Sequence, residues 1–149
     1  IQLPKGESKK LSYYLPESFG PHDLGIESGF MANVDHGKGT EEDDCLIKLA
    51  TKALNQSYSP YTGSLSGVAI KAKNGRTYQG AYAENAAFNP SLPPLQVAII
   101  QLLLDSQALE NIDSVALVET KSGHVSQLAS TQAMIEAINP DIPFTYQEI

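Results

Sequence analysis

The dipeptide Asn74-Gly75 constrains this chain more tightly than any other feature of its sequence. It separates two runs, residues 67–73 and 76–82, each of the length of a strand. Apolar side chains occupy alternate positions of the first run, at Val68, Ile70 and Ala72. Asn-Gly readily takes the positive φ angles that a two-residue hairpin turn requires. The pattern therefore predicts two adjacent antiparallel strands joined by a tight turn.

Helices and further strands are expected on both sides of this hairpin. A helix should begin near Thr40, where Thr40 and Asp43 form a weak capping box, and end near Gln56. Further helices are expected at about 92–105 and 127–138, and strands at about 113–119 and 143–147. The order α-β-β-α-β-α-β predicts an α/β fold, with helices packed on a mixed sheet.

The helix expected at 92–105 is apolar on nearly every side. Pro93 and Pro94 suit its first turn, where a missing N–H loses no partner. We expect most of its faces to be buried, with core positions at Leu92, Leu95, Ile99 and Leu103. A helix with a second apolar face often meets another subunit or domain.

Residues 1–38 differ from the rest, and we expect a linker or arm there, followed by one domain at 39–149. Glycine and proline interrupt the segment repeatedly, and no helical or strand period lasts longer than a turn. Leu11, Tyr13, Leu15 and Phe19 make it too apolar for a free tether, so it should pack on a neighbouring surface. The chain opens at Ile1 without an initiator methionine, and we expect it to be a piece of a longer polypeptide.

Composition excludes several classes of protein. Hydrophobic residues make up 42% and charged residues 18%, enough for a folded core. The net charge of −7 argues against nucleic acid and anionic membranes as partners. No apolar stretch approaches the roughly 20 residues that span a bilayer, and the first residues do not resemble a signal peptide. The single cysteine, Cys45, excludes an intrachain disulfide and suits a reducing cytoplasm.

Three segments in a fixed order carry a family resemblance. They are Ser-Pro-Tyr-Thr at 59–62, the Asn-Gly hairpin, and Tyr-Ala-Glu-Asn-Ala-Ala-Phe at 82–88, which runs into Pro-Pro-Leu-Gln at 93–96. Residues 40–149 thereby resemble cytidine deaminases. Residues 15–24 resemble the linker between the two deaminase-like domains of dimeric bacterial cytidine deaminases, and residues 89–96 resemble their C-terminal domain. The resemblance implies a three-layer, cytidine-deaminase-like fold.

The resemblance also implies that this segment lacks the family's catalytic groups. Cytidine deaminases hold zinc with one His or Cys and two further Cys, and a Glu two residues after the first ligand moves protons. Pro93 stands where the first ligand belongs, and Leu95 where the Glu belongs. No cysteine follows Cys45. We therefore expect no metal or catalytic residue here, and Zn²⁺ only in the full-length enzyme.

Substrate positions depart from the family as well. Ser64 stands where the family has an aromatic ring that stacks on the base, and Tyr82 replaces the Asn that would bind the ribose. Glu84 is kept. These departures imply a duplicated domain that has lost its own site. By the same resemblance, Ala87 and Phe88 are the candidates to touch the nucleoside in a partner subunit, although Phe88 could instead fill the domain's own core.

Simpler interpretations compete at other residues. His22, His36, His124 and Cys45 match no metal-ligand spacing, so surface or core roles are favoured. Glu84 is expected to form structural hydrogen bonds rather than to act as a catalytic carboxylate. Asn85 is expected to shape its loop as a turn or capping residue.

The resemblance implies the C-terminal, pseudo-catalytic domain of a homodimeric cytidine deaminase of pyrimidine salvage. The full-length hydrolase would convert cytidine and deoxycytidine to uridine and deoxyuridine. This domain, inactive alone, would bind the N-terminal catalytic domain of the same protein, support the dimer and close the partner's active site over its nucleoside. The alternatives are a free-standing small-molecule binding module of the same fold and an active deaminase with another metal set.

Overall fold

A four-stranded mixed sheet organises the computed structural model, which describes residues 1–149 except 3, 5, 28 and 88. Its strand order is β2-β1-β3-β4. β1 (Ser66–Ala72) pairs antiparallel with β2 (Thr77–Ala81) and with β3 (Ile112–Glu119). β3 pairs parallel with β4 (Phe144–Glu148). The predicted α/β class with a mixed sheet is confirmed.

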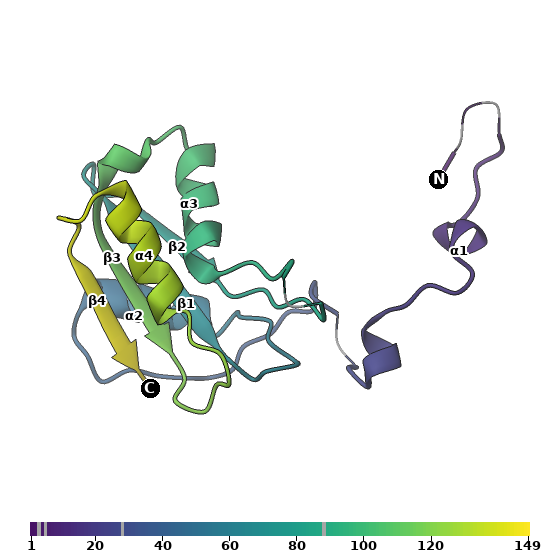
Figure 1. The fold of residues 1–149 in the computed structure, drawn as a ribbon, viewed down its shortest axis with the longest axis horizontal. Coiled ribbons are helices and arrows are strands. Elements are labelled where there is room, and N and C mark those ends of the chain that lie inside the picture. The colour runs from purple at the N-terminus through teal and green to yellow at the C-terminus, as the bar shows by residue number, and fades with distance from the viewer. Residues whose placement is uncertain (3, 5, 28, 88) are drawn as a thin grey trace.

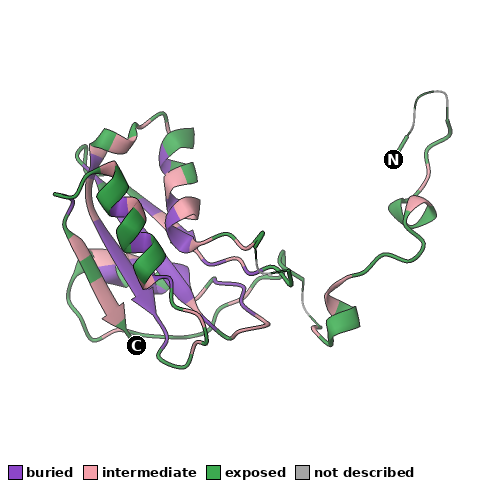
Figure 2. Cartoon of the chain, viewed as in Figure 1, coloured by how far each residue is buried: buried purple, intermediate pink, exposed green. Residues whose placement is uncertain are grey.

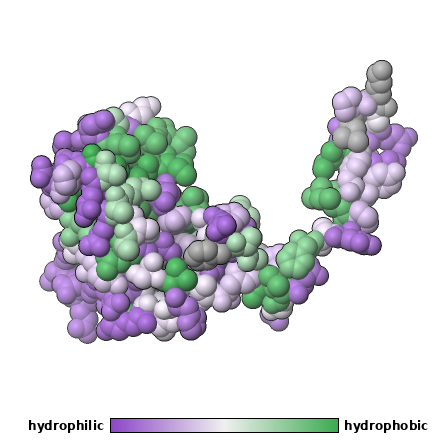
Figure 3. Space-filling model, in the orientation of Figure 1, coloured by the Kyte–Doolittle hydropathy of each residue, from purple (hydrophilic) through white to green (hydrophobic). Residues whose placement is uncertain are grey.

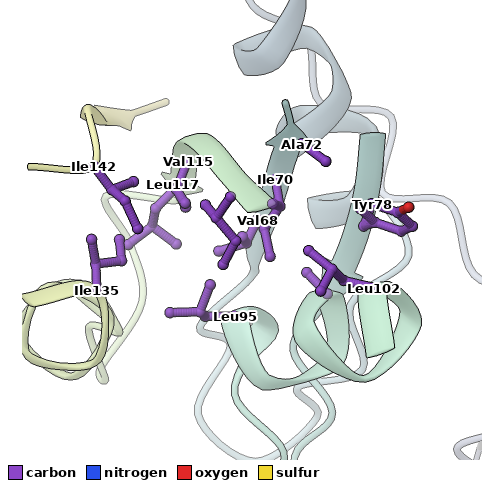
Figure 4. Packing of buried hydrophobic residues seen from close by; sticks show 12 residues of the cluster. Val68, Ile70, Ala72, Tyr78, Leu95, Leu102, Val115, Leu117, Ile135 and Ile142 are labelled. Carbon is purple, nitrogen blue, oxygen red and sulfur yellow. The ribbon is translucent and has the colours of Figure 1, made fainter. Parts of the chain in front are cut away.

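Three helices cover the two faces of this sheet, so the domain has three layers (Figure 1). α2 (Cys45–Leu54) packs on one face, and α3 (Pro94–Leu104) and α4 (Leu128–Ile138) pack on the other. Successive residues of a strand point to opposite faces. Val68 and Ile70 accordingly join the larger core under α3 and α4 (Figure 4). Ala69 joins the core under α2.

The Asn-Gly turn lies where the sequence predicts it. Gly75 has a φ of 85°, in the left-handed region that glycine adopts at no steric cost. The Asn74 side-chain oxygen accepts a hydrogen bond from the Arg76 amide at 3.0 Å. Beyond the turn, Arg76 forms an ion pair with Asp105, and the Tyr78 hydroxyl donates to the same carboxylate at 2.6 Å. The hairpin is thereby attached to the C-terminal end of α3.

The predicted start of the first helix is wrong by about five residues. α2 begins at Cys45, and Asp44 is its N-cap. The Asp44 carboxylate accepts hydrogen bonds from the amides of Leu46 at 2.6 Å and Ile47 at 3.1 Å. Thr40 instead closes a local turn, since its hydroxyl accepts from the Glu42 amide at 3.2 Å. An aspartate at the N-cap satisfies helix amides better than the weaker Thr40 box would.

The prediction that α3 is buried on most sides is also wrong within this chain. Its buried residues are Pro94, Leu95, Ala98 and Leu102, which face β1 and β2. The opposite face is exposed: Ile100 by 46%, Leu103 by 50% and Leu104 by 80%. Figure 3 shows this apolar surface over α3. One sheet covers one side of a helix, so a second apolar side needs another partner.

Most of residues 1–30 extend away from the domain (Figure 1). They include two single-turn helices, α1 (Leu11–Tyr14) and η1 (Pro21–Leu24), neither with a buried residue (Figure 2). Leu11, Tyr13, Leu15 and Phe19 are all more than half exposed, so the neighbouring surface expected to cover them stays a prediction. No helix in the described part of the chain is long and apolar enough to cross a membrane.

Further along the arm, the chain is tied to the end of α2. The His36 amide donates to the Asn55 carbonyl at 3.1 Å. Lys38 and Asn55 exchange two hydrogen bonds, at 2.7 and 2.8 Å. The segment just before the domain therefore lies against it rather than hanging free.

Two glycines set the spacing of the three layers. A Cβ atom on Gly80 of β2 would collide with the Pro94 carbonyl oxygen and the Ala98 amide of α3. A Cβ atom on Gly67 of β1 would collide with backbone atoms of Ala50 and Leu54 in α2. Helix backbone thus packs directly on strand backbone at both places, which only glycine permits.

We predict that Gly80→Ala lowers the free energy of unfolding by about 1–3 kcal/mol, because helix backbone cannot yield as a side chain can. Urea unfolding followed by circular dichroism measures the change. Gly39→Ala is the matched control, since a Cβ atom there meets nothing within 4 Å. Equal stability of the two variants would show that the backbone of α3 does not contact β2 closely at Gly80.

Candidate functional site

Three segments that the sequence singles out meet at the end of β2. The Tyr58 amide donates to the Tyr82 carbonyl at 2.8 Å, and the Glu84 amide donates to the Tyr58 carbonyl at 2.7 Å. These bonds place the loop at 57–64 beside residues 82–84. α3 begins nearby, because Ala83 and Leu92 form an antiparallel bridge.

Glu84 has a buried carboxylate that fastens this loop. The residue is 6% exposed, and its Oε2 accepts hydrogen bonds from the amides of Tyr61 at 2.8 Å and Thr62 at 3.2 Å. The other oxygen, Oε1, is buried and has no hydrogen-bond partner among the described residues. Two amide bonds within the chain confirm the predicted structural role.

Tyr82 fills space next to Glu84 with a ring that is 1% exposed. Burial raises the pKa of its phenol, and the nearby Ser91 hydroxyl offsets part of this effect. The phenol therefore stays neutral in the physiological range and cannot act as a base. This large ring stands where the resemblance implies a ribose-binding amide.

Ser64 connects the same loop to the segment between β3 and α4. Its hydroxyl oxygen accepts from the Val125 amide at 2.8 Å, and its own amide donates to the Thr62 hydroxyl at 3.3 Å. Gly123 approaches so closely that a Cβ there would lie 2.9 Å from the Ser64 Cα. Ser64 is 3% exposed and thus offers no face to a ligand.

Sequence reasoning missed Glu119, which orders that segment. Its Oε1 accepts from the Gln127 amide at 2.6 Å, and its Oε2 accepts from the Ser126 hydroxyl at 2.8 Å. Glu119 is only 5% exposed. A carboxylate that ends an apolar strand shortly before a helix was the signal available, since such groups commonly satisfy amides at a helix start.

Pro93 and Leu95 lie at the start of α3. Pro93 is the N-cap residue, and Leu95 is 1% exposed within the larger core (Figure 4). Val68, Leu117 and Ile135 belong to the same cluster. Hydrocarbon from three elements therefore surrounds the position where the resemblance expects a proton-shuttling carboxylate.

Ala87 lies in the loop that leaves β2 for α3. Ala83 and Leu92 close the base of this loop with backbone hydrogen bonds of 3.1 and 2.8 Å. The Asn85 side chain accepts from the Ala87 amide at 2.9 Å, which confirms its predicted role in shaping the turn. Ala87 is exposed, and Phe88 lies outside the described residues.

The residues around this site do not fit a zinc ion. Pro93 has no ligand atom, and Cys45 is exposed at the first turn of α2, a different element. Among the described residues, no group of three or more His, Cys, Asp and Glu could hold a metal. His36 contacts the Ser57 carbonyl oxygen through Nε2 at 2.9 Å and is not joined by His22, His124 or Cys45.

We predict that Leu95→Glu destabilises the protein by roughly 3 kcal/mol or more, because an unpaired carboxylate would enter the hydrocarbon core. Thermal and urea unfolding measure the loss. Leu104→Glu on the same helix is the control, since Leu104 is 80% exposed and should change stability by about 0.5 kcal/mol or less. Equal effects of the two variants would contradict the burial of Leu95.

Comparison with known proteins agrees with this scaffold. Residues 11–132 match the family described as the cytidine and deoxycytidylate deaminase zinc-binding region. The chain is 62% identical over 146 residues to "Cytidine deaminase" of Vibrio vulnificus, and 54% identical over 149 residues to that of Vibrio parahaemolyticus. These matches cover 98% and 100% of the chain. The chain spans about half the length of these curated relatives, 50% in each case.

Solved structures share the fold. The cytidine deaminase from Burkholderia pseudomallei superposes with a TM-score of 0.61 at 24% identity, over 70% of this chain and 83% of that one. The cytidine deaminase from Mycobacterium leprae gives a TM-score of 0.56 at 25% identity, over 66% and 82%. These likenesses confirm the three-layer, cytidine-deaminase-like fold. With the family match over residues 11–132, they lead to one conclusion: the chain belongs to the cytidine deaminase family.

Proposed function

We propose that this chain is the C-terminal, non-catalytic domain of a homodimeric, zinc-dependent cytidine deaminase. The complete enzyme would add water to cytidine or deoxycytidine and release ammonia and uridine or deoxyuridine, as a cytoplasmic step of pyrimidine salvage. This domain would support the dimer and close the active site of the partner subunit. The burial of Leu95 in hydrocarbon is the observation that carries the proposal.

The chemistry of the reaction supports a non-catalytic role. Hydrolytic deamination by this family needs a metal-activated water and a carboxylate that transfers protons. By the resemblance, Pro93 and Leu95 stand at the corresponding positions, and they offer neither a ligand atom nor an acid. Repair at these two positions alone would leave two thiolate ligands missing, since no cysteine follows Cys45.

The length of the relatives supports a division of labour. This chain aligns with half of each of these proteins, which are named cytidine deaminases. In our proposal, the other half of the full-length protein holds zinc and the proton shuttle. The chain described here then contributes the folded support and the loop that carries Ala87.

Exposed apolar surface supports an interface. Ile100, Leu103 and Leu104 form a continuous apolar face on α3, and Leu15 and Phe19 are exposed on the arm. Apolar surface of this kind marks contact regions on proteins. We assign the α3 face and the arm to contacts with the N-terminal domain and the second subunit.

We predict that the purified chain retains far less than one zinc ion per molecule after dialysis and does not deaminate cytidine above a blank. The double variant Pro93→His with Leu95→Glu should remain metal-free and inactive, since the two thiolates are still absent. Metal analysis by mass spectrometry and a spectrophotometric assay provide the measurements. One tightly held zinc per chain, or turnover that depends on it, would overturn the proposal.

We predict that Ala87→Trp in the full-length protein lowers kcat/KM for cytidine by roughly tenfold or more, while zinc content and melting temperature stay normal. The indole would obstruct approach of the exposed loop to the partner's nucleoside. Ala108→Trp is the control, because Ala108 is also exposed but follows the other end of α3. Unchanged kinetics for Ala87→Trp would remove the loop from the active site.

Phe88→Ala separates two roles for the neighbouring residue. A contact with the partner's nucleoside predicts lower kcat/KM with normal melting. A role in the domain's own core predicts a loss of roughly 3–5 kcal/mol in the free energy of unfolding. Kinetics and thermal melting of the same full-length variant distinguish the two outcomes.

A further inference from the structure

The Asn74-Gly75 dipeptide has a chemical reactivity besides its role in the hairpin turn. Asn74 is the only asparagine in the chain that is followed by glycine. In water, the backbone nitrogen of the residue after an asparagine can attack the side-chain amide carbon, and asparagine is accordingly among the thermolabile residues. Glycine hinders this attack least, because it has no side chain and the widest backbone freedom. The sequence therefore places the most reactive asparagine at the tip of the hairpin.

The structure exposes this dipeptide to water but fixes the atoms that would react. Asn74 and Gly75 are both exposed. The attacking nitrogen belongs to Gly75, and its N–H donates to the Ala72 carbonyl at 2.8 Å. The side-chain oxygen of Asn74 accepts from the Arg76 amide at 3.0 Å. Attack requires the side-chain carbon to turn towards the Gly75 nitrogen, and both hydrogen bonds oppose that rotation.

Gln107 holds the other end of the Asn74 side chain from outside the hairpin. Nδ2 of Asn74 donates to Oε1 of Gln107 at 3.0 Å, and the Asn111 side chain donates to the same oxygen at 3.4 Å. Asn111 ends the short helix η2 (Leu109–Asn111), and its carbonyl accepts from the Lys73 amide at 2.8 Å. The segment that follows α3 thus fixes the turn through both backbone and side-chain contacts.

We propose that Asn74 is a site of spontaneous deamidation that Gln107 protects in the folded chain. When the turn opens, the Gly75 nitrogen loses its proton and bonds to Cγ of Asn74. The Cγ–Nδ2 bond breaks, and Nδ2 takes up a proton and leaves as ammonia. Water then opens the resulting five-membered succinimide at one of its two carbonyl carbons, which gives aspartate or isoaspartate. This inference depends on the present chain alone and not on the proposed deaminase function.

Either product weakens the attachment of the turn. A carboxylate at position 74 has no N–H to donate to Gln107, and it adds a negative charge to a region that already contains Asp105, the ion-pair partner of Arg76. Isoaspartate also adds a methylene group to the main chain, which a tight turn between paired strands cannot absorb. We therefore expect the deamidated protein to melt at a lower temperature than the unmodified one.

Incubation of the whole chain at mildly alkaline pH, folded or unfolded in guanidinium chloride, tests the proposal. Peptide mapping by mass spectrometry measures conversion at each asparagine. We expect Asn74 to convert several times faster in the unfolded chain than in the folded one. In the unfolded chain it should also convert several times faster than Asn85, which alanine follows. Equal rates at Asn74 in both states would exclude protection, and faster conversion of Asn85 would exclude Asn74 as the site.

Variants of Gln107 test the protecting contact. Gln107→Ala removes the oxygen that holds Nδ2 of Asn74, and the folded variant should deamidate at Asn74 several times faster than wild type. Gln107→Glu keeps an oxygen acceptor at this place and should stay close to the wild-type rate. Gln101→Ala, on the exposed side of α3, is the control and should change nothing. Circular dichroism shows that each variant is folded during the incubation.

Two results would overturn the role of Gln107. They are a wild-type rate in folded Gln107→Ala protein and a rate in folded Gln107→Glu protein as fast as that of the unfolded chain. The comparison of folded with unfolded wild-type protein needs no variant, so it decides whether the fold protects Asn74 even if Gln107→Ala does not fold.

Discussion

The burial of β1 on both faces is the constraint on which the rest of the domain depends. Its Val68 and Ile70 face α3 and α4, and its Ala69 faces α2, so one strand belongs to both cores. Small residues allow this arrangement, because Gly67 and Gly80 admit helix backbone directly onto the sheet. Ser64, Glu84 and Ala87 lie in loops beside the strands of this three-layer support, the kind of position that a rigid scaffold holds in place.

Beyond the end of β2, the buried carboxylate of Glu84 orders the neighbouring loop. Glu84 holds the amides of Tyr61 and Thr62, and Ser64 continues the connection to Val125. Glu119 then holds Ser126 and Gln127 before α4 begins. Hydrogen bonds of Ser64 and Glu119 thus join the β3–α4 segment to its neighbours.

Much of the fold was predictable from the sequence because its strongest signals are local. The Asn-Gly turn, the prolines before α3 and the alternating run in β1 each depend on neighbouring residues, and the structure follows all three. The start of α2 was missed because Thr40 and Asp44 both resemble caps, and only packing decides between them. The exposure of Leu103 and Leu104 was missed because hydropathy does not say what covers a helix.

The candidate site was predictable only in part, for the same physical reason. Asn85 bonds the Ala87 amide two residues further along, so its role in the turn follows from residue type. A hydrogen-bonding role for Glu84 was expected as well, but its partners, the amides of Tyr61 and Thr62, lie 23 and 22 residues away. The contacts of Ser64 with Val125 and of Phe30 with Tyr58 join residues far apart in sequence, so no local pattern reveals them.

The leucine at position 95 has an energetic explanation. A fully buried leucine contributes about 1.5–3 kcal/mol relative to an exposed one, whereas an unpaired buried carboxylate costs several kcal/mol. An acid at position 95 would lie among the apolar side chains of the larger core, so Leu95 is the more stable choice. Glu84 is an exception, because its Oε1 is buried and has no hydrogen-bond partner among the described residues. Its Oε2 nevertheless orders the neighbouring loop through the amides of Tyr61 and Thr62, so part of the cost of burying the carboxylate is offset by charge-assisted hydrogen bonds.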